Sequence, residues 1–142
     1  MQKITIKNLQ KKIPIYPTRI KTAVLKVFAC ESKDLSLDIT VTFVNDKKIR
    51  ELNRKFLKTD RTTDVLAFDL SAVGNKNNLT ADLVISADTA AKNAKIYKSS
   101  TQSELSLYAI HGALHLLGYD DHTLKDSNLM REKECQYIKQ TQ

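Results

Sequence analysis

Hydrophobic and polar residues alternate along several short stretches of the chain, which is the pattern of strands that bury one face in a core. The clearest stretch is 35–44, Leu-Ser-Leu-Asp-Ile-Thr-Val-Thr-Phe-Val, which is also rich in β-branched residues. Residues 3–9, 64–70 and 82–86 are shorter candidate strands. Because a polar loop around Gly74 joins the last two, we expect these two strands to pair antiparallel.

Other stretches repeat their apolar residues about every 3.6 positions, which indicates helices that bury one side. We expect these helices at about 18–32, 45–56, 88–97, 101–118 and 126–138. Four of them have a side chain that can cap the amino end: Thr18, Asn45 or Asp46, Ser100 or Thr101, and Asp126 or Ser127. In the last helix, the residues expected to face inward are Met130, Cys135 and Ile138.

This order of helices and strands predicts an α+β fold. We expect one layered domain over residues 1–142, in which a mixed sheet of mostly short strands packs against helices. The composition, with 42% hydrophobic and 27% charged residues, is that of a soluble globular protein.

The chain is expected to be cytoplasmic and to have no membrane partner. Its first residues alternate as in a strand, not as in a signal peptide. No apolar run approaches the roughly 18–20 residues that a membrane span needs. Cys30 and Cys135 lie far apart and outside any C-x-x-C pair, which favours free thiols in a reducing compartment over a disulfide.

The net charge of +7 favours an anionic partner, of which nucleic acid is the commonest. The basic residues are spread over 3–61 and 92–98, whereas 119–126 contains three aspartates and one lysine. Many basic proteins bind nothing acidic, and the chain has no aromatic-rich strand of the kind that stacks bases. A basic body around a locally acidic segment nevertheless suits an enzyme that attracts a polyanion.

All three histidines of the chain fall within residues 111–122, His-Gly-Ala-Leu-His-Leu-Leu-Gly-Tyr-Asp-Asp-His. His111 and His115 lie one helical turn apart on the same face, a spacing at which two imidazoles can hold one metal ion. The alternative is a helix that packs two histidines in a core. The glycine stop and the acidic, histidine-containing end of this segment favour the metal.

Gly118 is suited to end the helix in a left-handed conformation, so that a metal site would lie at the carboxyl end of the helix. The returning chain could then present Asp121 or His122 as a third ligand. Three protein ligands leave a zinc ion one open position, which is typical of a catalytic site.

Gly112 occupies the second position of the histidine motif, where peptidases with H-E-x-x-H carry their general base. A zinc-peptidase mechanism therefore lacks its base here. A glycine inside a helix costs about 1 kcal/mol relative to alanine. We expect that cost where a strand or a substrate must come close.

The run His-Gly-Ala-Leu-His-Leu-Leu-Gly-Tyr-Asp at 111–120 resembles the signature of the YbeY family, metal-dependent endoribonucleases of ribosomal RNA maturation. The similarity extends to a central segment with Leu52-Asn53, Phe56, Asp60 and 63–68, to the strand 81–86, and to Met130 and Glu134 in the last helix. The resemblance therefore covers most of the chain.

The resemblance implies a zinc-dependent, single-strand-specific endoribonuclease that trims the 3′ end of small-subunit ribosomal RNA and helps discard defective ribosomes. It also implies one zinc ion per chain, held by three side chains of the signature, with His111 and His115 catalytic through that metal. The partners it implies are single-stranded RNA and ribosomal RNA, with ribosomal proteins or a ribosome-associated GTPase as candidate protein partners.

The family usually places its third histidine directly after Gly-Tyr-Asp, where this chain has Asp121 and puts His122 one residue later. Reading from Tyr119 to Met130 without a gap puts Asp121 in the ligand position, and a carboxylate is a competent zinc ligand. A one-residue bulge would bring in His122 instead, and imidazole is the commoner metal ligand. Spacing favours Asp121, with His122 as the alternative or supporting ligand.

A second departure is Leu57, where many family members have an arginine that is thought to assist catalysis. Neighbouring basic residues are candidates to bind the RNA phosphates in its place: Arg54, Lys55, Lys58 and Arg61. The simpler alternative is that these residues form only a solvated basic loop.

The competing function is a metal-stabilised RNA- or ribosome-binding assembly factor without catalysis. Structural zinc sites usually close with four protein ligands, often cysteines, and here a fourth ligand requires both Asp121 and His122. The residue pattern therefore favours catalysis. Hydrolysis of a small neutral substrate fits the net charge less well.

Overall fold

A four-stranded mixed sheet organises the molecule, and its strands lie in the order β1-β2-β4-β3. The computed structural model describes residues 2–31, 34–58, 63–74 and 76–141. The strands are β1 (Gln2–Asn8), β2 (Ser36–Val44), β3 (Val65–Asp69) and β4 (Asn78–Ser86). β2 pairs in parallel with both β1 and β4, and β3 pairs antiparallel with β4 as predicted.

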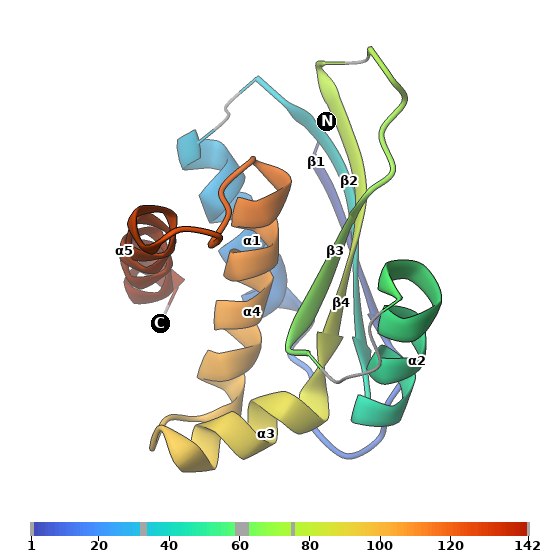
Figure 1. Cartoon of the computed structure of the whole chain (residues 1–142), viewed down its shortest axis with the longest axis vertical. Coiled ribbons are helices and arrows are strands. Elements are labelled where there is room, and N and C mark those ends of the chain that lie inside the picture. Colours follow the sequence, from blue (N-terminus) through green and yellow to red (C-terminus); the bar gives the residue numbers. More distant parts are fainter. Residues whose placement is uncertain (1, 32–33, 59–62, 75, 142) are drawn as a thin grey trace.

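Helices cover the two faces of the sheet unequally, as Figure 1 shows. They are α1 (Pro17–Glu31), α2 (Asp46–Leu57), α3 (Ala87–Ile96), α4 (Thr101–Leu116) and α5 (Leu124–Thr141). α1 and α4 lie on one face, and α5 packs outside them against both. α2 lies on the other face, and α3 lies at the end of the sheet where β4 ends. The predicted α+β fold is confirmed.

The alternating strand pattern divides the hydrophobic residues between the two faces. Leu37, Ile39, Val41 and Phe43 of β2 are buried in the main core, together with the apolar sides of α1 and α4. Val44, which points the other way, belongs to a smaller cluster beneath α2 that also contains Ile49, Leu66 and Val84. α4 therefore packs against the sheet on one side and against α1 and α5 on the other. This packing holds the part of α4 that contains His111 and His115 rigidly.

Several element boundaries differ from the sequence prediction. β4 begins at Asn78, before the predicted start at residue 82, because 78–81 already alternates between exposed and buried residues. β2 and β4 are nine residues long, longer than the short strands expected for most of the sheet. The predicted caps Asn45 and Ser100 are confirmed, since their side chains accept the backbone N–H groups of Lys48 and Ser103.

The last helix begins earlier than predicted, at Leu124, because the Thr123 hydroxyl accepts the backbone N–H of Asp126 at 3.0 Å. Met130 faces inward as predicted, but the prediction for Cys135 is wrong, because its side chain is exposed. Tyr137, fully buried, occupies the inward turn instead. The spacing from Met130 to Tyr137 is two helical turns, so Cys135 falls on the outer side.

Both cysteines are free, as predicted, and both are exposed. Across the described residues, no helix combines the length and hydrophobicity that a membrane span requires.

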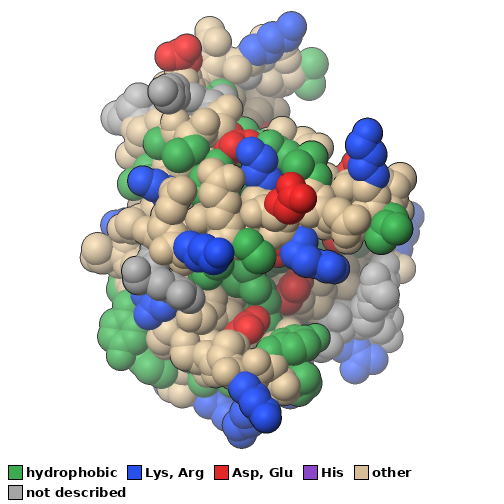
Figure 2. All heavy atoms as spheres, turned by 90° about the vertical axis from the view of Figure 1, so that its left-hand side faces the viewer, with side chains coloured by type: hydrophobic (Ala, Val, Ile, Leu, Met, Phe, Trp, Pro, Cys, Tyr) green, Lys and Arg blue, Asp and Glu red, His purple; other side chains and the backbone are tan. Residues whose placement is uncertain are grey.

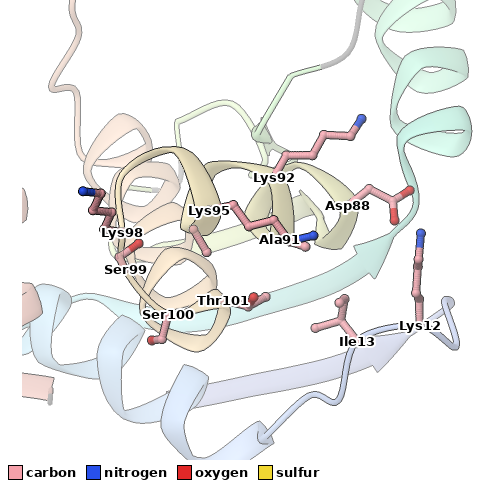
Figure 3. Close-up of a pocket in the computed structure, with 11 residues that line it drawn as sticks. Lys12, Ile13, Asp88, Ala91, Lys92, Lys95, Lys98, Ser99, Ser100 and Thr101 are labelled. Atoms are coloured by element: carbon pink, nitrogen blue, oxygen red, sulfur yellow. The ribbon is translucent and has the colours of Figure 1, made fainter.

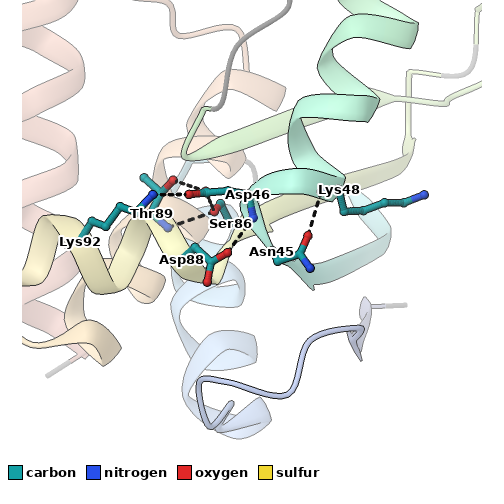
Figure 4. A network of polar contacts seen from close by, with 7 residues as sticks. All are labelled: Asn45, Asp46, Lys48, Ser86, Asp88, Thr89 and Lys92. Atoms are coloured by element: carbon teal, nitrogen blue, oxygen red, sulfur yellow. Dashed lines mark hydrogen bonds and ion pairs between the residues drawn. The ribbon is translucent and has the colours of Figure 1, made fainter.

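Asp46 joins the amino ends of α2 and α3 (Figure 4). Its carboxylate accepts hydrogen bonds from the hydroxyls of Ser86 at 2.6 Å and Thr89 at 2.8 Å, and it pairs with the Lys92 ammonium at 2.6 Å. In return, the backbone N–H of Asp46 donates to Asp88 at 2.9 Å. Burial raises the pKa of Asp46, but these hydrogen bonds and the lysine charge lower it by more, so the carboxylate stays ionised.

Candidate metal centre

Gly112 lets α4 approach the sheet closely between the two helical histidines. A Cβ atom added there would lie 2.8 Å from Cδ2 of Leu83 on β4 and 3.2 Å from Cγ2 of Val65 on β3. Such separations are too short for ordinary packing. The expectation that a strand comes close at this glycine is therefore confirmed, and the turn that carries His111 and His115 lies against the edge of the sheet.

His111 and His115 point their Nε2 atoms at one another, 2.9 Å apart, with ring centroids separated by 4.5 Å. Two nitrogens bound to one tetrahedral zinc ion at about 2.0–2.1 Å lie about 3.3 Å apart. A small rotation of either ring therefore suffices for both to share an ion. The separation of the two Nε2 atoms, as well as their chemistry, is therefore compatible with a shared metal ion.

The carboxyl end of α4 is a Schellman motif built on Gly118, whose φ is +99°. The N–H of Gly118 donates to the carbonyl of His115 at 3.0 Å, and the N–H of Tyr119 donates to that of Leu114 at 3.1 Å. The predicted left-handed helix stop is confirmed. It turns the chain back towards the face of α4 that carries the histidines.

Asp121 is the third member of the group that this turn assembles. One ligand atom from each of His111, His115 and Asp121 lies within 4.8 Å of the others, so the group could hold a metal ion. Both histidines are partly buried and Asp121 is exposed, which leaves one side of the group open to solvent. His122 lies outside this group, and its backbone N–H donates to Asp120 at 3.4 Å.

Glu134 of α5 supports the ring of His111 from behind, with 3.3 Å between its Oε1 and Nδ1. A hydrogen bond to Nδ1 orients the imidazole and leaves Nε2 for a metal. Burial lowers the pKa of His111, but the hydrogen bond and charge of Glu134, together with the charges of Asp64 and Asp121, raise it by more. Sequence reasoning placed Glu134 in the last helix without assigning this contact, which only the packing of α5 on α4 reveals.

Glu31, the last residue of α1, anchors the loop that carries Asp121. Its carboxylate accepts hydrogen bonds from the hydroxyls of Tyr119 and Tyr137, the latter at 2.6 Å, and pairs with Lys133 at 3.2 Å. Burial raises the pKa of Glu31, but the three donors lower it by more. Sequence reasoning missed this anchor, because its members come from distant parts of the chain.

The predicted phosphate-binding residues lie apart from α4, on or after α2 across the sheet. Lys58 ends α2 in a left-handed conformation with φ +55°. The Phe56 ring lies 5.7 Å from that of Phe68 on β3, so the carboxyl end of α2 adjoins the edge strand next to the histidines. Of the four predicted residues, Arg54, Lys55 and Lys58 are described and Arg61 lies outside the described residues.

Basic residues do not form one block on the face that Figure 2 displays. Lysine and arginine side chains on this face are interspersed with aspartates and glutamates. This arrangement agrees with the dispersed lysines and arginines of the sequence. Against such a background, a local cluster of lysines indicates a candidate site for an anionic ligand.

A layered α+β domain with two helical histidines and an aspartate gathered beside a sheet edge defines a class of small proteins with a candidate metal centre. The family profile described as Endoribonuclease YbeY matches residues 5–142. The chain belongs to the YbeY family.

Individual relatives agree with this assignment. A protein named Endoribonuclease YbeY from Desulforamulus reducens is 38% identical over 141 residues, covering 92% of each chain. One of the same name from Anaeromyxobacter sp. strain Fw109-5 is 42% identical over 99 residues, covering 70% of this chain; the match spans about half, 52%, of that relative's length. A solution structure from Thermotoga maritima superposes with a TM-score of 0.65 at 28% identity, covering 99% of this chain and 89% of that one.

Proposed function

We propose that the chain is a zinc-dependent endoribonuclease that cleaves single-stranded RNA, and that it acts in 3′-end maturation of small-subunit ribosomal RNA and in ribosome quality control. The observation that carries the proposal is the His111–His115–Asp121 group, open to solvent on one side, in a chain of the YbeY family. A cytoplasmic location, with ribosomal proteins or a ribosome-associated GTPase as partners, belongs to the same proposal.

In this mechanism, His111, His115 and Asp121 would hold the zinc ion. Bound there, the ion would supply Lewis-acid polarisation of a phosphoryl oxygen and of a water molecule. Glu134 accepts a hydrogen bond from Nδ1 of His111 and so keeps Nε2 directed at the site. Gly112 holds this turn of α4 against β3 and β4, which limits movement of both histidines.

RNA would approach across the short edge strand β3. The candidate phosphate contacts are Arg54, Lys55, Lys58 and Arg61, and the net charge of +7 would draw the polyanion towards the protein. Binding through phosphates weakens as salt increases. Cleavage should therefore fall steeply with ionic strength, whereas hydrolysis of a small neutral substrate should not.

The test pairs metal content, measured by elemental analysis, with cleavage of a single-stranded RNA. We expect wild type to carry about one zinc ion and to cleave. Both properties should be lost in His115→Ala and strongly reduced in Asp121→Ala. His122→Ala is the matched control, because it removes an exposed neighbouring side chain outside the group.

Two results would overturn parts of the proposal. Zinc bound firmly by a wild type that cleaves no RNA would favour the non-catalytic assembly factor. Equal zinc loss in Asp121→Ala and His122→Ala would contradict Asp121 as the single third ligand.

A further inference from the structure

A pocket of about 830 Å³ lies at the opposite end of α4 from the candidate metal centre. It is bounded by α3, by the first turn of α4, and by the connector between β1 and α1 (Figure 3). Neither of the two helical histidines lines it. From Thr101 in the pocket to the histidines, the rise of α4 is roughly 15–20 Å at about 1.5 Å per residue.

Four lysines and one aspartate give the pocket its charge: Lys12, Lys92, Lys95, Lys98 and Asp88. Lys92 already pairs with Asp46 at 2.6 Å and points away from the pocket in Figure 3. Lys95 extends into the pocket and Lys12 rises beside it from the connector, whereas Lys98 lies at the opposite rim with its ammonium directed outward. The charge of Lys92 is neutralised by Asp46, and that of Asp88 offsets one further lysine. The pocket therefore has an excess of positive charge.

The connector that carries Lys12 is held in place by hydrogen bonds. The side-chain oxygen of Gln10 accepts the backbone N–H groups of Lys12 at 3.0 Å and Ile13 at 2.9 Å. Gln102 of α4 donates to the carbonyl of Pro14 at 2.9 Å, which fixes the connector to the pocket wall. Less ordering is then needed when a ligand meets Lys12.

Hydroxyl groups complete an environment suited to phosphate. Ser100 and Thr101 line the pocket beside Lys95. The Ser100 hydroxyl oxygen accepts the N–H of Ser103, so its own proton can be donated outward. Ammonium and hydroxyl donors of this kind are the groups that proteins use to contact nucleic-acid phosphates.

An exposed aromatic side chain lies between these lysines in sequence, beside the pocket lining and not part of it. Tyr97, between Lys95 and Lys98 in sequence, is 70% exposed, and its neighbour Ile96 is 67% exposed. Neither side chain therefore contributes to the hydrophobic core. Lysines that follow a phosphate backbone, interleaved with an aromatic ring on which a base can stack, are the combination that binds single-stranded nucleic acid.

We propose that Lys12, Lys95, Lys98 and Tyr97 form a second contact for single-stranded RNA, remote from the bond that is cleaved. The inference rests on the proposed function, because the RNA strand that is cleaved at the histidine group is the same strand that would contact this pocket. A strand of several nucleotides would reach from the histidine group to this pocket, whereas a very short one would not. The pocket then makes the protein favour long unpaired segments over short ones.

The test compares two charge-reversed double variants on RNA substrates of two lengths. Lys95→Glu/Lys98→Glu alters the pocket, and Lys21→Glu/Lys26→Glu is the matched control, with the same change in net charge at exposed positions of α1. kcat/KM is measured for single strands of about 20 and about five nucleotides. The thermal midpoint of each variant checks that the fold is retained.

We expect the kcat/KM advantage of the long RNA to fall at least about tenfold in the pocket variant and to persist in the control. The slope of log KM against log salt for the long RNA should become shallower by about 1.4, which is about 0.7 for each lost phosphate contact. Tyr97→Ala should reduce the same advantage at least about fivefold without changing the salt slope.

The inference fails if the pocket variant and the control change the long-to-short ratio equally while wild type cleaves both RNAs. In that case the pocket does not contact the RNA, and the proposed nuclease function stands. If wild type with bound zinc cleaves neither RNA, the proposed function itself fails. The two failures are thus distinguished by the behaviour of wild type alone.

Discussion

At the residue scale, Glu134 determines how His111 is presented to a metal. Its carboxylate is mostly buried and lies 3.3 Å from Nδ1 of the ring. Hydrogen-bond partners of this kind typically change metal affinity by 10–100-fold when they are removed. They orient the ring before the ion arrives and favour the tautomer that leaves Nε2 unprotonated.

We therefore predict that Glu134→Ala weakens zinc binding by about 10–100-fold, as measured by competition with a chromogenic chelator. Glu132→Ala is the matched control, because Glu132 lies on the exposed side of the same helix. Equal zinc affinity in both variants would show that Glu134 does not orient His111.

Glu31 provides a pH dependence of stability with a defined sign. Its pKa is lowered in the folded protein relative to the ordinary value of 4.5, because the hydrogen bonds from Tyr119, Tyr137 and Lys133 outweigh burial. A carboxyl whose folded pKa is lowered contributes stability that is present above its unfolded pKa. That contribution is lost as the pH falls through the folded pKa.

The expected result is that Glu31→Gln is less stable than wild type at neutral pH. The difference should shrink as the pH is lowered below about 4. Urea unfolding of both proteins across this range measures it. A difference in unfolding free energy that is independent of pH would mean that the charge of Glu31 contributes nothing.

At the scale of the element, the end of α4 links backbone conformation to the candidate metal centre. Gly118 and Gly74 both have positive φ, +99° and +86°, and an added Cβ would meet no atom within 4 Å at either position. A side chain at either glycine therefore costs only the left-handed backbone strain, about 1–2 kcal/mol. The two positions differ in function, because only Gly118 leads into the segment that carries Asp121.

Gly118→Ala and Gly74→Ala should thus lose similar unfolding free energy, but only Gly118→Ala should weaken zinc binding. Thermal unfolding of the zinc-free proteins measures the first property, and zinc titration measures the second. If Gly74→Ala weakens zinc binding as much, global destabilisation is the cause and the Schellman turn does not position Asp121.

Elements with a strong local pattern were predictable, and contacts between distant elements were not. The alternation in 35–44 is sufficient to indicate β2, and the spacing of His111 and His115 is sufficient to indicate a shared ligand face. The carboxylates of Glu31, at the end of α1, and Glu134, within α5, carry no such signal, because a single charged residue on a helix is usually solvated. Their roles depend on how α1, α4 and α5 pack together.

The same reason explains the misplaced Cys135. Its apolar character agreed with an inward position, but the buried side of α5 is set by Met130 and Tyr137, which contact the core. Helix periodicity predicts which residues share a face. It does not predict which of two nearly equivalent faces meets the neighbouring helix.

At the scale of the whole molecule, the contacts around the candidate centre connect α4 and α5 to α1, the first helix of the chain. Lys133 and Glu134 are neighbours on α5, yet Lys133 pairs with Glu31, 102 residues earlier, and Glu134 supports His111. Contacts with such large sequence separation form late in folding, because a long loop must first be closed.

This long-range closure has a consequence for a chain that is still being synthesised. Domains generally fold as units while the chain emerges from its amino end. A nascent chain that has exposed α4 but not yet α5 already displays both histidines, but Glu31 lacks Lys133 and Tyr137 and His111 lacks Glu134. The metal-binding group would therefore be fully supported only once α5 has docked, so that a nascent chain without α5 would compete poorly for zinc.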